Sequence, residues 1–153
     1  MLNRYVLMML AATLCLSGCK MFFALEKPIA RVQSVTLDEQ TEHGSRVLVT
    51  VELANPNDVA LPLVDAQYTL SLAPGSRVIR LRDAPNRTLP SKGRQVITLP
   101  AALPVSGGGN LRGASYRVAG SINYEPPGEI RALLAEAGIP LPASEFFGSG
   151  TLD

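Results

Sequence analysis

The sequence predicts a mainly β protein, a two-sheet antiparallel β-sandwich of about seven strands with one short helix. Three observations lead to this fold class. Apolar and polar residues alternate along several short segments, turn residues separate these segments at near-regular spacing, and one segment alone has helical periodicity. Alternation with a period of two is typical of strands that bury one face and expose the other.

The alternation is clearest over residues 47–53 and 66–72, where apolar side chains occupy every second position. The same pattern recurs over 116–124, and weaker strands are expected over 77–82, 94–99 and 145–152. These patterns predict a core that includes Val47, Val49, Val51, Leu53, Tyr68, Leu70, Leu72, Val118 and Ile122. A two-sheet antiparallel core of this kind is immunoglobulin- or fibronectin-like.

The earliest strand, over 30–37, changes phase between Val32 and Val35, which predicts a β-bulge near Gln33-Ser34. Residues that favour turns lie between the strands because Gly tolerates positive φ, Pro fixes φ, and Asn or Asp can bond its own backbone. The predicted turns are Asn55-Pro56-Asn57-Asp58, Pro74-Gly75, Ala84-Pro85-Asn86, Ser91-Lys92-Gly93 and the segment 106–110.

The predicted helix lies between Gly128 and Gly138. Apolar residues recur there at i, i+3, i+4 and i+7, namely at Ile130, Leu133, Leu134 and Ala137. Pro126-Pro127 before the segment and Pro140 after it are typical of helix boundaries. A helix of about three turns is too short to be stable alone, so we expect its apolar stripe to pack onto the sheets.

The amino terminus predicts a lipoprotein signal peptide. Arg4 precedes an apolar run from Val6 to Leu16 that is too short to span a bilayer but suits a signal-peptide core. The run ends in a lipobox, Leu16-Ser17-Gly18-Cys19. Small residues at 17 and 18 admit a signal peptidase, and the Cys19 thiol is the nucleophile that takes a diacylglycerol. The alternatives are an ordinary signal peptide or a short buried helix.

This interpretation divides the chain into a signal peptide (1–18), a lipidated tether (19–28) and a sandwich domain (29–153). The predicted partner is a lipid membrane, bound through acyl chains such as palmitate on Cys19. The predicted location is the periplasmic side of the cell envelope. Lys20, where an Asp would retain many bacterial lipoproteins at the inner membrane, favours the outer membrane.

The charge and cysteine content of the mature chain exclude several classes of protein. Without residues 1–18, which contain Arg4 and no acidic residue, 13 basic residues face 13 acidic ones. Nucleic acid is therefore not an expected partner, because it requires a concentrated basic surface. Cys19 is then the single cysteine, so no internal disulfide can form and the core alone must stabilise the domain.

The segment from Val47 to Leu72, VLVTVELANPNDVALPLVDAQYTLSL, resembles the late embryogenesis abundant type 2 family, also called the WHy (water stress and hypersensitive response) domain. The shared features are an apolar strand, Asn55-Pro56-Asn57, a loop of small apolar residues and a strand with a central aromatic, here Tyr68. The segments 88–100 and 116–122 are similar to later parts of the family, and the resemblance covers roughly 30–152. The helix at 129–137 is a departure from the family's pattern.

The resemblance implies a non-enzymatic domain involved in the response to desiccation or water stress. The alternative function is an envelope binding or assembly module for a hydrophobic ligand, an envelope protein or a transport complex. Independently of the family, Pro56 removes a backbone donor and restricts Asn55, so the Asn-Pro-Asn segment predicts a structural corner at the end of a strand.

Candidates for chemistry are few. His43, the only histidine, is expected in a solvated turn, and no second His or spare Cys accompanies it to bind a metal. The acidic pair Asp38-Glu39 at a strand end is expected to be solvated. Arg80 and Arg82 share a strand face and could contact anionic headgroups, although a solvated face that discourages edge pairing is the simpler interpretation. We predict no catalytic residues, no metal and no cofactor.

Overall fold

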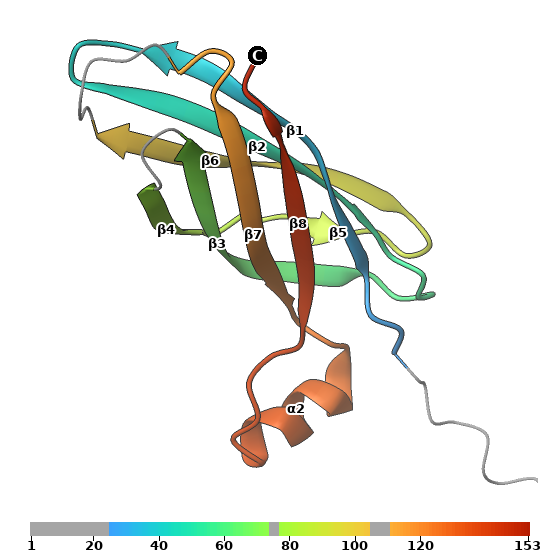
Figure 1. Cartoon of the computed structure of the whole chain (residues 1–153). Coiled ribbons are helices and arrows are strands. Elements are labelled where there is room, and N and C mark those ends of the chain that lie inside the picture. Colours follow the sequence, from blue (N-terminus) through green and yellow to red (C-terminus); the bar gives the residue numbers. More distant parts are fainter. Residues whose placement is uncertain (1–24, 74–76, 105–110) are drawn as a thin grey trace, which may run out of the picture.

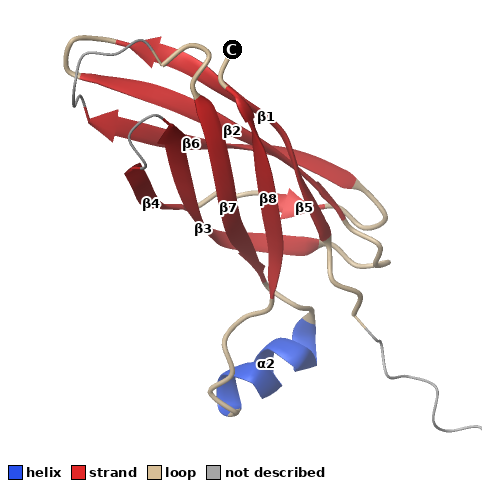
Figure 2. Cartoon of the chain, in the orientation of Figure 1, coloured by secondary structure: helices blue, strands red, loops and turns tan. Residues whose placement is uncertain are grey.

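The computed structural model describes residues 25–73, 77–104 and 111–153. The chain forms two antiparallel sheets that face each other as a β-sandwich (Figures 1 and 2). In strand order, one sheet is β1-β2-β6 and the other is β4-β3-β7-β8, with the short β5 added to β3. The predicted fold class is confirmed.

The described part of the chain contains eight strands and one helix. The bounds are β1 Ile29–Gln40, β2 Gly44–Ala54, β3 Leu61–Ala73, β4 Arg77–Asp83, β5 Thr88–Leu89, β6 Arg94–Pro104, β7 Ser115–Tyr124, α2 Gly128–Glu136 and β8 Ala143–Thr151. The strand beyond the expected seven is β5, a two-residue pairing with β3 that brings the fully buried Leu89 into the core. Two residues are too few for alternation to be recognised in a sequence.

The sequence pattern identified the buried faces of β2, β3 and β7. Val47, Val49, Val51 and Leu53 are completely buried in β2, and the outward residues between them are half-buried. Of the predicted core, Leu72 alone is half-buried. It lies near the end of β3, where fewer side chains of the opposite sheet pack over it. The register inferred from the period of two is therefore confirmed.

The predicted bulge in β1 is also present. The pairing of β1 with β2 shifts between Val32 and Ser34, and again between Leu37 and Glu39. An extra residue in one strand moves the next side chain to the other face, so Val35 reaches the core despite its three-residue spacing from Val32.

The end of β6 differs from the prediction. The sequence pattern predicted a strand over 94–99, which ends before Pro100, a residue that cannot donate a hydrogen bond to a neighbouring strand. The strand instead continues to Pro104. Since β6 pairs with β2 on one side and is the edge of its sheet, Pro100 is tolerated there.

The helix α2 forms at the predicted place, but the expectation that its apolar stripe packs onto the sheets is wrong. None of its residues is buried. The segment leaves the end of β7 and returns to β8 beside it, since Asn123 pairs with Ala143 and the Tyr124 amide donates to the Pro142 carbonyl at 3.1 Å. The helix therefore lies beyond the strand ends and covers neither sheet face (Figure 1).

The centre of β7 packs closely against its neighbours. A Cβ on Gly120 would lie 2.6 Å from the Gln67 carbonyl oxygen and 2.7 Å from the Cζ of Phe146. Glycine at this position therefore lets the buried Phe146 ring of β8 lie across the strand.

Tyr68 connects the two sheets. From β3 its ring enters the core, and its hydroxyl donates a hydrogen bond to the Pro100 carbonyl of β6. Burial, with a smaller contribution from the Asp83 carboxylate, raises the pKa of Tyr68 to about 12. The folded protein therefore favours the neutral phenol.

We expect alkaline solution to destabilise the sandwich through this residue. An unfolded tyrosine ionises near pH 10, so stability is unaffected below that pH and falls as the pH rises towards about 12. The full loss corresponds to about 2–3 kcal/mol. Urea unfolding of Tyr68→Phe should show about 1 kcal/mol lower stability at pH 8 and a shallower alkaline decline. Tyr124, whose pKa burial also raises, should leave a residual decline. Identical declines in both proteins would contradict this role.

Candidate functional site

The turn between β2 and β3 is built around Asn55-Pro56-Asn57, called the Asn-Pro-Asn corner below. Pro56 lacks an amide hydrogen and its ring excludes a helical conformation at Asn55, so β2 ends at Ala54. The two asparagines are buried, with exposed fractions of 3% and 9%. Buried amides require hydrogen-bond partners, and the corner supplies them from three segments of the chain.

Asn55 joins the corner to the turn between β5 and β6. Its Nδ2 donates to the carbonyl oxygens of Val59 at 2.7 Å and Pro90 at 3.0 Å. Its Oδ1 accepts hydrogen bonds from the backbone amide of Asn57 at 3.0 Å and from Nδ2 of Asn57 at 2.9 Å. Both donors and both acceptor positions of the Asn55 amide are thus occupied.

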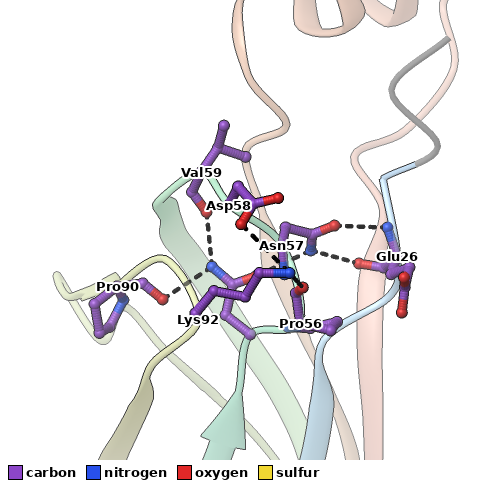
Figure 3. A network of polar contacts seen from close by, with 8 residues as sticks. Glu26, Pro56, Asn57, Asp58, Val59, Pro90 and Lys92 are labelled. Carbon is purple, nitrogen blue, oxygen red and sulfur yellow. Dashed lines mark hydrogen bonds and ion pairs between the residues drawn. The ribbon is translucent and has the colours of Figure 1, made fainter. Parts of the chain in front are cut away.

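Asn57 binds the segment that precedes β1. Its Oδ1 accepts from the Glu26 amide at 2.8 Å, and its Nδ2 donates to the Glu26 carbonyl at 2.8 Å (Figure 3). The side-chain amide therefore pairs with both polar backbone groups of Glu26, as an adjacent strand would. This contact fixes the chain at the point where it reaches the sandwich.

Lys92 closes the corner from the other side. Its Nζ donates to the Pro56 carbonyl at 2.7 Å and lies 3.4 Å from the Asp58 carboxylate, while its amide donates to the Asn57 carbonyl at 2.8 Å (Figure 3). Lys92 has a φ of +47°, a left-handed conformation that the tight turn requires. The predicted turn at Ser91-Lys92-Gly93 thus also holds the corner.

A second polar cluster surrounds Asp65 on β3. Its Oδ2 accepts from Nε and Nη2 of Arg82, each at 3.0 Å, and its Oδ1 accepts from Nδ2 of Asn123 at 2.8 Å. Burial opposes ionisation of this carboxyl, but hydrogen bonds from Gln67 and Asn123 and the Arg82 charge outweigh it and lower its pKa. Asp65 is therefore a carboxylate that orients Arg82.

The two arginines suggested as an anionic contact have different surroundings. Arg82 is engaged by Asp65, although its side chain is 73% exposed. Arg80 is exposed on the same outer face of β4, which is the edge of its sheet. Charges at a sheet edge discourage pairing with another chain.

The remaining candidates from the sequence are His43 and the acidic pair Asp38-Glu39, and they do not form a metal site. His43 is exposed in the turn between β1 and β2, where its amide donates to Oγ1 of Thr41 at 3.2 Å. Asp38 and Glu39 both form ion pairs with Arg46 of the neighbouring strand. Across 25–73, 77–104 and 111–153, no group of three or more His, Cys, Asp or Glu residues could hold a metal ion.

The lipobox, Leu16-Ser17-Gly18-Cys19, lies outside the described residues. Within the described ranges, no helix has the length and apolar character needed to cross a bilayer.

The sequence did not indicate the Asp65 cluster or the role of Glu26. A signal for the first was present, since Asp65 is the one charged residue in the otherwise apolar stretch from Val59 to Ala66. A carboxylate at such a position requires partners when the strand is buried. For Glu26 no local signal exists, because Asn57 contacts only its backbone.

The fold is similar to three solved structures. The solution structure of the late embryogenesis abundant (LEA) protein At2g46140.1 aligns with a TM-score of 0.59 and 16% identity, over 98% of this chain and 85% of that one. The solution structure of AT1g01470 from Arabidopsis thaliana aligns with a TM-score of 0.55 and 19% identity, over 84% of each chain. The crystal structure of a protein from Archaeoglobus fulgidus aligns with a TM-score of 0.50 and 13% identity, over 85% of this chain and 98% of that one.

The chain has a WHy-like fold. This is the fold that the resemblance to the late embryogenesis abundant type 2 family predicted, and the solved LEA structures confirm it. No protein-family model matches the sequence, and no curated protein matches it by sequence.

Proposed function

We propose that this chain is a non-enzymatic bacterial lipoprotein that protects the cell envelope during water stress. The observation that carries the stress role is the similarity of the sandwich to LEA proteins. The lipobox at the end of a signal-sized apolar run supports attachment through Cys19. Two or three acyl chains at that cysteine would give lasting membrane attachment, which a single chain does not. Lys20 favours the periplasmic side of the outer membrane.

The outward positions of the strands provide a physical route to protection. They carry hydroxyl side chains, including those of Thr50, Thr98 and Ser121. Such groups can hydrogen-bond headgroups or client proteins as water is withdrawn, because a hydrogen bond to water is exchanged for one to the protein. The core is already folded in water, and no buried side-chain nitrogen or oxygen in the described residues lacks a hydrogen-bond partner.

The test is survival of cells that lack the gene. Deletion should lower survival after drying and after osmotic shock, and the wild-type gene should restore it. The Cys19→Ala form should remain an unprocessed precursor without lipid. It should restore survival less than the wild type does, because it would not be attached to the membrane in the same way. Unchanged survival in both stresses would contradict the protective role. A stoichiometric envelope protein recovered with the wild type would then favour the binding or assembly module.

A further inference from the structure

The helix α2 leaves apolar side chains uncovered. Leu133 is 64% exposed and Ile139, just beyond the helix, is 54% exposed. An ion pair of 3.2 Å between Arg131 and Glu125 connects the helix to the end of β7. A nine-residue helix has little stability of its own. These apolar side chains are therefore available to contact a surface outside the described part of the chain.

The exposed apolar surface has a fixed shape. The Gly138 amide donates to the Ala135 carbonyl at 3.2 Å, and the Ile139 amide donates to the Leu134 carbonyl at 2.9 Å. With a φ of +65° at Gly138, these two hydrogen bonds form a Schellman motif, which closes the helix. The motif turns the chain back at the last helical turn and holds Ile139 beside it. Leu133 and Ile139 thus belong to one preformed end of the molecule.

The chain reaches the sandwich at this same end. Oγ of Ser144, which directly follows the start of β8, donates to the Pro28 carbonyl at 2.8 Å. Lys27 lies 3.8 Å from Glu145, and Asn57 holds Glu26. Figure 1 shows β1 beginning at the end of the sandwich from which α2 projects. The seven residue steps from Cys19 to Glu26 can span at most about 25 Å.

We propose that the end of the sandwich that carries α2 faces the bilayer, with Leu133 and Ile139 in contact with the lipid interface. This inference rests on the proposed lipid on Cys19, which would hold Glu26 within about 25 Å of the membrane surface. A short tether keeps the local concentration of the apolar end in the millimolar range, so a contact too weak to attach the free domain is still populated. Asn57 is the positioning residue, since it fixes the tether beside this end.

The charges of this end select the kind of lipid. Residues 125–142 contain three acidic residues and one basic residue. Anionic headgroups would be repelled, so the contact fits a zwitterionic surface and relies on apolar burial. The contact should consequently be insensitive to salt.

The experiment uses the full lipidated chain in vesicles of phosphatidylcholine, with and without bromine on the acyl chains. The chain has no Trp, so Leu133→Trp introduces a single reporter. Phe147→Trp is the matched control, because Phe147 is 84% exposed at the middle of β8 on the outer face of the sandwich. Labelling with a clickable fatty acid first establishes lipid on Cys19. Circular dichroism establishes that each variant keeps the β-sheet spectrum.

In lipid-labelled protein, brominated lipid should quench the indole of Leu133→Trp at least about twofold more than that of Phe147→Trp, as expected for a helix at the interface. The difference should persist at high salt. Equal quenching of the two reporters in labelled protein would overturn the orientation while leaving the anchor intact. Blue-shifted but unquenched emission from Leu133→Trp would also overturn it, because a second copy of the chain would then cover the helix. Absence of label would remove the anchor and the inference with it.

Discussion

Replacing Val51 with Asp should abolish folding of the sandwich. Val51 is completely buried in the central strand of its sheet, between Val32 of β1 and Ile97 of β6. No cation lies among these neighbours to pair with a carboxylate. An unpaired buried charge costs several kcal/mol, on the order of the total stability of about 5–15 kcal/mol. Circular dichroism during thermal unfolding should show no cooperative transition.

The matched control is Thr98→Asp. Thr98 is exposed on the outer face of β6, next to Thr50 in the same sheet. The same charge added there should change the free energy of unfolding by only about 0.5 kcal/mol. A cooperative transition in Val51→Asp close to that of the control would contradict the assigned faces of β2.

The sequence was most informative where a rule acts along a short stretch of chain. Alternation revealed the inward faces of β2, β3 and β7, because successive side chains of a strand must point to opposite sides. The change of phase between Val32 and Val35 revealed the bulge for the same reason. The corner at Pro56 followed from the missing amide hydrogen and restricted backbone of one dipeptide.

Features that depend on distant parts of the chain were less predictable. Helical periodicity identified α2 but not its partner, because an apolar stripe does not specify what covers it. The continuation of β6 through Pro100 depended on its being an edge strand, which the topology alone decides. The contact between the Asn57 side chain and Glu26 joins residues 31 positions apart. It uses only backbone atoms of Glu26, so the residue type at that position could not predict it.

Changing Asn55 to Asp should destabilise the protein more than changing it to Ala. Alanine leaves the carbonyls of Val59 and Pro90 and the amide of Asn57 without their partner, at a cost of about 2–4 kcal/mol. Aspartate has the same shape but places a carboxylate oxygen against those two carbonyls, where Nδ2 had donated to both. Repulsion and the burial of a charge, at 3% exposure, should raise the cost to about 3–5 kcal/mol.

Asn86→Asp is the control for this change, because Asn86 lies exposed in the turn after β4, where its Nδ2 donates to the Ala84 carbonyl at 3.1 Å. Its φ of +48° is one that Asp also tolerates, so the same chemical change should cost less than about 1 kcal/mol. Urea unfolding of the four proteins should therefore rank wild type and Asn86→Asp as most stable, then Asn55→Ala, then Asn55→Asp. Equal stability of Asn55→Asp and the wild type would show that donation by Nδ2 does not hold the corner. Asn55→Ala below Asn55→Asp would show that filling the site matters more than its hydrogen bonds.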